Sequence, residues 1–146
     1  FGPIGMAITF PLGVLVMAVV TWGLARLFDV KTAFAGVLGV VVYSQVVRPL
    51  QFVAGILQSF VLDVSRMDSV HDVSLSLARF LDQPETATLM VNLAARVDVF
   101  VLWATALIAV GLRSATGLSR GGAWVVAVLV WLLAALPIAL GSIVGG

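Results

Sequence analysis

Two side chains of opposite charge interrupt apolar stretches of the sequence and are the first candidates for chemistry. Arg48 lies near the middle of one stretch, and Asp98 lies near the start of another. A charged side chain at the centre of a bilayer costs about 2.5–3.5 kcal/mol on insertion scales, so it usually faces a partner or water. The two residues differ in expected depth. We therefore expect Arg48 to pair with Asp98 or to reach water or a lipid headgroup.

Polar residues around Arg48 extend this candidate. Pro49 follows it directly, and Gln45 and Gln51 lie within one helical turn. Two interpretations stay open: a structural ion pair or solvated kink, and a functional polar pocket. The candidate polar intramembrane site comprises Arg48, Pro49, Gln45, Gln51 and Asp98.

The other reactive residue types argue against catalysis. His71 is the only histidine and the chain has no cysteine, so a metal site lacks the ligands that zinc prefers. Lys31 lies in a short turn rather than within a span, which argues against a Schiff-base pigment. The sequence has no GxGxxG or Walker-type motif. We expect no catalytic residue, no metal, no cofactor and no nucleic-acid partner.

Composition assigns the chain to the membrane. Hydrophobic residues make up 62% and charged residues 10%, and the mean hydropathy is +1.18, whereas about 25% of residues are charged in soluble domains. The 146 residues have room for about four to five spans of about 20 residues. Because the chain begins with Phe1 rather than Met, we interpret the start as an interior point of a longer parent chain. We expect one membrane domain over residues 1–146.

Four apolar stretches predict an all-α, polytopic helical bundle. They cover about residues 4–28, 32–62, 88–113 and 121–141. The second stretch contains Pro49, whose ring removes the hydrogen bond to the carbonyl of Gln45, so we predict one helix that bends or unwinds within one turn of Pro49. The alternative is two separate crossings of about 15 residues, which are short for a 30 Å hydrocarbon core.

Charge placement favours one orientation in the membrane. The segment 63–85 carries five acidic residues against Arg66 and Arg79. Because basic residues concentrate in cytoplasmic loops, we expect loops 29–31 and 114–120 to be cytoplasmic and loop 63–85 to be non-cytoplasmic. Within this last loop, apolar residues at helical spacing predict a short interfacial helix over about residues 72–82. Splitting the second stretch into two crossings breaks this charge pattern.

Loose motifs resemble those of the Ypt-interacting-protein (Yip) domain family in its bacterial form. The third span opens with an Asp-x-Phe-x-x-Trp pattern, and further matches lie upstream and at its exit: Thr32, Tyr43, Pro49, Asp98, Phe100, Trp103, Gly111, Leu112 and Arg113. Arg48 and the turn at residues 29–31 depart from the family pattern. The resemblance implies a five-span helical domain whose first span is absent here, in a bacterial inner membrane. It brings no catalytic residues.

The sequence therefore predicts a membrane protein that is not an enzyme and that binds membrane lipids or other membrane proteins, as an accessory subunit of a larger complex. Small residues form the faces expected to pack against other helices: Gly36, Gly39, Gly55, Ser59, Ala134, Ala135 and Ala139. The alternative is a small transporter or channel module, in which the polar residues around Arg48 line a substrate path.

Overall fold

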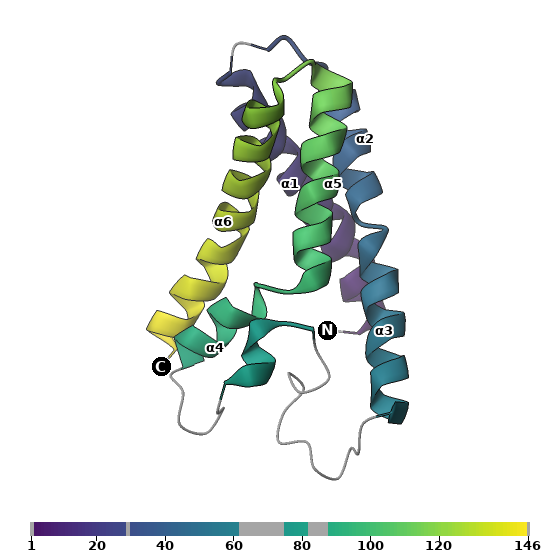
Figure 1. Cartoon of the computed structure of the whole chain (residues 1–146), viewed down its shortest axis with the longest axis vertical. Coiled ribbons are helices and arrows are strands. Elements are labelled where there is room, and N and C mark those ends of the chain that lie inside the picture. Colours follow the sequence, from purple (N-terminus) through teal and green to yellow (C-terminus); the bar gives the residue numbers. More distant parts are fainter. Residues whose placement is uncertain (1, 29, 62–74, 82–87, 146) are drawn as a thin grey trace. The chain divides into compact units, whose positions relative to one another are not determined.

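The described elements of the chain are helices (Figure 1). The computed structural model describes residues 2–28, 30–61, 75–81 and 88–145. In these residues the elements are α1 (Pro3–Arg26), α2 (Phe34–Ser44), α3 (Val47–Val61), the 3-10 helix η3 (Leu77–Phe80), α4 (Thr88–Ala95), α5 (Val99–Thr116) and α6 (Arg120–Val144). Four stretches within the described ranges are long and apolar enough to cross a membrane: Pro3–Arg26, Phe34–Val61, Val99–Thr116 and Arg120–Val144. The prediction of an all-helical protein with four membrane spans is confirmed.

The second of these stretches is interrupted where the sequence predicts a break. Helix α2 ends at Ser44, α3 begins at Val47, and Gln45 and Val46 form a turn between them. Pro49 is the third residue of α3 and has no backbone N–H to donate to the carbonyl of Gln45. The helix therefore unwinds within one turn of Pro49, as predicted.

The third expected span, residues 88–113, is divided in the structure. Helix α4 ends at Ala95, and α5 begins at Val99 and continues to Thr116. The division occurs at Asp98, whose side chain caps α5 and so starts a new helix inside an apolar stretch. Of the expected interfacial helix at 72–82, the described part contains η3; residues 72–74 and 82 lie outside the described ranges.

The chain forms two compact units. Unit 1 consists of residues 1–45 and 105–131, and unit 2 consists of residues 46–104 and 132–146. Helices α5 and α6 each contribute residues to both units. The expectation of one membrane domain stays a prediction.

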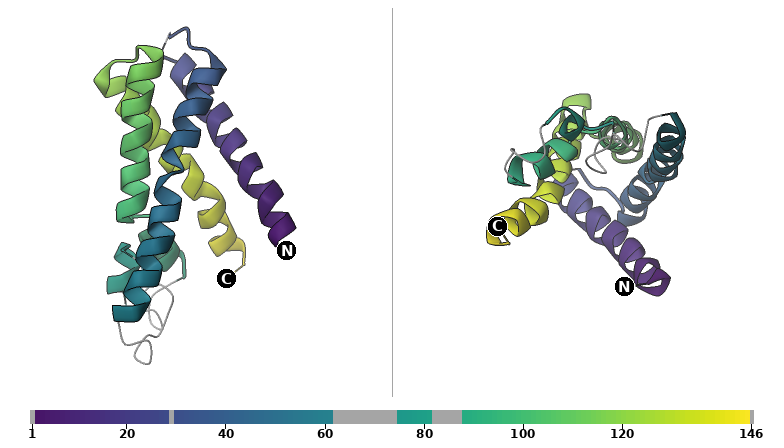
Figure 2. Two further views of the ribbon diagram at one scale, coloured as in Figure 1. Left: turned by 90° about the vertical axis from the view of Figure 1, so that its right-hand side faces the viewer. Right: turned by 90° about the horizontal axis from the view of Figure 1, so that it is seen from below.

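Unit 1 contains a cluster of small and branched apolar side chains. Helices α1 and α2 lie side by side (Figure 2), and the cluster joins them to the parts of α5 and α6 in this unit: Ala18, Ala25, Val37, Val41, Ile108, Ala109, Leu112, Leu118, Ala123, Val126, Ala127 and Val130. Among the glycines of this unit, Gly111 is the most closely packed, because a Cβ added there would meet Cγ1 of Val40 at 2.6 Å. A glycine is therefore required where α5 crosses α2.

Unit 2 holds its elements together with polar contacts. Helix α4 packs beside η3. The side-chain amide of Asn92 on α4 donates a hydrogen bond to Oγ of Ser142 on α6 at 2.7 Å, and Ser142 Oγ donates to the carbonyl of Ile138 at 2.9 Å. In an apolar solvent, such hydrogen bonds contribute to helix association.

Candidate polar site at the break in the second span

Gln45 directly follows the last residue of α2, and its side chain contacts α1. Its backbone N–H donates to the carbonyl of Val42 at 3.1 Å, which closes the last turn. Its side-chain Nε2 lies 3.3 Å from the carbonyl oxygen of Val41, 3.4 Å from Ser44 Oγ and 3.8 Å from Met17 Sδ. The amide of Gln45 is thus engaged within unit 1.

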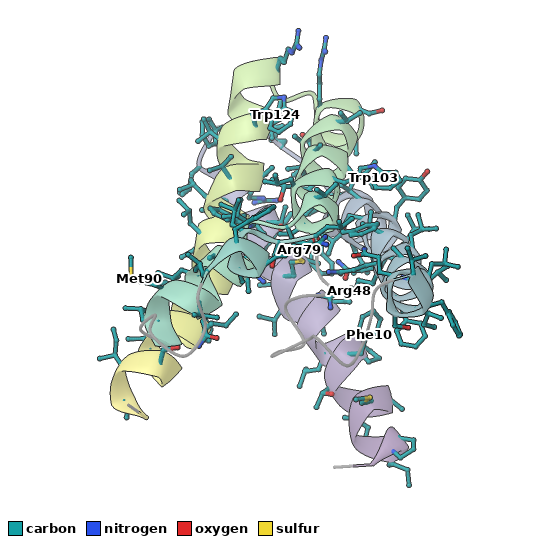
Figure 3. The ribbon with its side chains drawn as sticks, turned by 60° about the horizontal axis from the view of Figure 1, so that its bottom comes forward. Phe10, Arg48, Arg79, Met90, Trp103 and Trp124 are labelled. Carbon is teal, nitrogen blue, oxygen red and sulfur yellow. The ribbon has the colours of Figure 1, made fainter. Side chains whose placement is uncertain are left out.

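Arg48, Pro49 and Gln51 occupy the first turns of α3, on the other side of the break. All three side chains are exposed. Figure 3 labels Arg48 and also Arg79, which belongs to η3 in the same unit. Residues 46–104 belong to unit 2, whereas Gln45 belongs to unit 1. Gln45 therefore lies in one unit, and Arg48, Pro49 and Gln51 lie in the other.

Arg96 is a neighbour of Arg48 that the sequence analysis did not include in the site. It lies between α4 and α5, outside the membrane-spanning stretch that begins at Val99. Burial lowers the pKa of the Arg96 guanidinium from its ordinary value, and the positive charge of Arg48 lowers it further. Two guanidinium groups in one region make a suitable complement for carboxylate or phosphate oxygens. In the sequence, the signal for this residue is a second charged side chain two positions before Asp98.

Asp98 has a local structural role in unit 2. Its side chain is 3% exposed, and its Oδ1 accepts a hydrogen bond from the backbone N–H of Phe100 at 2.7 Å. The backbone on either side of Asp98 pairs with the backbone at the start of η3. Leu77 N–H donates to the carbonyl of Val97 at 3.0 Å, and Val99 N–H donates to the carbonyl of Leu75 at 3.4 Å. The carboxylate therefore caps α5. Its pairing with Arg48 stays a prediction.

Among the described residues, no group of three or more His, Cys, Asp or Glu side chains is placed to hold a metal ion. His71 lies outside the described ranges.

Comparison with known proteins identifies a family over nearly the whole sequence. The family model described as the Yip1 domain matches residues 1–141. No curated protein and no solved structure matches the chain. The match includes the Asp98, Phe100 and Trp103 pattern and the segment around Pro49 on which the resemblance was based.

Proposed function

Because the chain belongs to the Yip1 domain family, we propose that it is a non-enzymatic membrane protein that binds other membrane proteins through its helices, as an accessory subunit of a larger complex. Its membrane class follows from the four apolar helical stretches in the described part of the chain. In the bilayer, the outer surfaces of these helices contact either lipid or the helices of a partner protein.

The observation that carries this proposal is the presence of two kinds of glycine on α2. Gly36 is already packed, since an added Cβ meets the Cβ of Ala115 at 3.9 Å. At Gly39 an added Cβ meets nothing within 4 Å. Gly39 is exposed, and its neighbours Val42 and Tyr43 are 53% and 68% exposed, whereas Val37 and Val41 are fully buried on the other side of α2.

The open glycine supports helix binding because of how helices associate in lipid. Lipid tails are as apolar as the side chains, so association depends on close packing, which small residues permit. A Cβ added to Gly55 on α3 also meets nothing within 4 Å. A partner helix can therefore approach the backbone of α2 at Gly39 without displacing a side chain.

The test uses the absence of native cysteines. In native membranes, Gly39→Cys carrying a short photoreactive maleimide is expected to form a cross-linked adduct, identified by mass spectrometry. Gly36→Cys is the matched control on the same helix, because Gly36 is covered by Ala115. The exposed side of α2, which carries Gly39, Val42 and Tyr43, is its open face. Adducts at both positions, or at neither, contradict binding of a partner through this open face. An adduct with a second copy of the chain replaces the accessory-subunit proposal with self-association.

A second candidate function is transport through the polar break. The observation that favours it is the unwound turn at Gln45 and Val46, followed within one turn by Arg48, because transporters place substrate sites at interrupted helices. Purified protein in sealed liposomes is then expected to release entrapped anions, and Arg48→Gln is expected to abolish the release. Liposomes that stay as tight as protein-free ones reject this candidate.

A further inference from the structure

Unit 1 contains two connections between helices, one between α1 and α2 and one between α5 and α6. Both turns lie at the same end of the unit. Phe28, just after α1, lies 3.6 Å from the position of an added Cβ on Gly122 in the first turn of α6. Gly36, in the first turn of α2, has the corresponding contact with Ala115 near the end of α5. Figures 1 and 2 show both turns together, on the far side of unit 1 from the start of α1.

This end carries an excess of positive charge. Four exposed basic side chains, which we call the basic collar, lie in the two connections or in the helix ends next to them: Arg26, Lys31, Arg113 and Arg120. In the sequence of residues 26–36 and 113–122 the only acidic residue is Asp29. Neither α2 nor α6 has an acidic residue in its first turn.

One member of the collar, Arg26, lies over an aromatic side chain that has further contacts of its own. The guanidinium carbon of Arg26 lies 4.7 Å from the centre of the Trp22 ring. Trp22 Nε1 donates a hydrogen bond to the carbonyl of Thr32 at 3.1 Å, and the ring of Phe34 meets the Trp22 ring edge-on with centroids 6.0 Å apart. A cation held over an indole is partly ordered before any ligand binds.

The start of α6 adds to the positive potential. Arg120 is the first residue of α6, where the helix macrodipole is positive and a cation is unfavourable. Ser119 Oγ accepts from the N–H of Gly122 at 3.0 Å, and Gly121 is exposed. An anion near Arg120 removes the repulsion between its charge and the helix end.

The surface next to the collar is apolar and suited to lipid. Leu27 and Trp124 are 76% and 40% exposed, and Trp124 projects from the early part of α6 (Figure 3). Tryptophan is enriched at the level of lipid headgroups. The collar therefore lies where a charged surface meets an apolar one. A phospholipid also has a charged headgroup next to apolar acyl chains, so both of its parts can contact matching side chains here.

We propose that the basic collar binds the phosphate headgroups of anionic phospholipids. This inference is independent of the proposed function, because it concerns the two turns of unit 1 rather than the open face of α2 or the residues around Arg48. The lipid neutralises the collar, and its acyl chains run along the exposed apolar side chains of the adjoining helix ends.

The experiment measures binding by native mass spectrometry of the full chain in neutral detergent at low ionic strength. The probes are dioctanoyl phosphatidylglycerol, dioctanoyl phosphatidylcholine and inorganic phosphate. We expect phosphatidylglycerol to bind more tightly than both other probes. In the variant Arg113→Gln/Arg120→Gln, its affinity should fall about fivefold for each charge removed, and added salt should weaken binding by the wild type.

Two further variants separate charge from folding. Arg113→Lys/Arg120→Lys keeps both charges and should keep the affinity. Arg79→Gln removes a cation from η3 in unit 2 and should leave it unchanged. Equal losses in the Arg79 and collar variants indicate non-specific attraction and overturn the proposal. Equal affinity for phosphatidylcholine, or for inorganic phosphate, overturns it as well.

Discussion

The carboxylate of Asp98 has a structural role that does not require Arg48. Sequence alone marks it as an ion-pair partner, because a carboxylate inside an apolar stretch needs compensation. In the structure it lies directly before α5 and accepts the N–H of Phe100 at 2.7 Å. An acidic residue before an apolar run is also a signal for a helix start. The cap satisfies a backbone donor that would otherwise be left without a partner.

Neutralising Asp98 distinguishes the cap from the ion pair. Asparagine is as good a capping residue as aspartate, whereas alanine costs about 0.5–2 kcal/mol. We therefore expect Asp98→Asn to keep the thermal stability of the purified protein and Asp98→Ala to lower it. If a charge pair with Arg48 dominates instead, both variants are destabilised alike, and Asp98→Arg combined with Arg48→Asp recovers part of the loss.

The packing around Gly111 limits the size of the side chain at that position. The Cβ of alanine at this position meets Cγ1 of Val40 at 2.6 Å, and valine is β-branched and cannot turn away freely. Overpacking of this kind costs about 1–3 kcal/mol, so Gly111→Ala should lower the unfolding temperature in detergent. Gly39→Ala is the matched control, since its added Cβ meets nothing within 4 Å. A loss at Gly39 equal to that at Gly111 contradicts this account.

At the scale of elements, the sequence predicts which segments are helical better than where each helix begins. The four spans follow from hydropathy, which depends on composition over about 20 residues. The division of residues 88–113 depends on one hydrogen bond made by Asp98, which hydropathy does not detect. The contribution of Arg96 near Arg48 depends on how α3 and the α4–α5 connection fold within unit 2. Such contacts are set by tertiary packing, so only the chemical types of the site residues could be predicted.

The break between α2 and α3 gives the prediction at this scale. Pro49→Ala restores an N–H that can donate to the carbonyl of Gln45, so the turn at Gln45 and Val46 should become more helical. Hydrogen exchange of the backbone amides at residues 46–50 is expected to slow by tenfold or more. Pro11→Ala is the control, because Pro11 lies inside α1, which continues through it. If the exchange rates at residues 46–50 do not change, Pro49 is not the cause of the break, and the side-chain contacts of Gln45 cause it instead.

Many of the large apolar side chains in the described part of the chain are exposed. Along α1 and α6 they include Ile4, Met6, Leu140 and Ile143, each at least 60% exposed. In water such a surface drives aggregation, but in lipid it is the solvated surface. The free energy of folding therefore depends on the bilayer.

Orientation in the membrane is the last whole-molecule prediction. The basic collar should face the cytoplasm, because basic residues in short loops are retained there, and the acidic segment 63–85 should lie on the opposite side. Since the chain has no cysteine, Ser119→Cys and Ser69→Cys each provide one labelling site for a membrane-impermeant maleimide. In intact cells Ser69→Cys should react and Ser119→Cys should not, and in inverted vesicles the reactivity should reverse. Only the stretch Val99–Thr116 separates the two sites, so reaction of both from the same side means that this stretch does not cross the membrane. If the chain instead turns back at Gln45 and Val46, residues 34–61 enter and leave the membrane on one side, and both results are reversed: Ser119→Cys reacts in intact cells and Ser69→Cys does not.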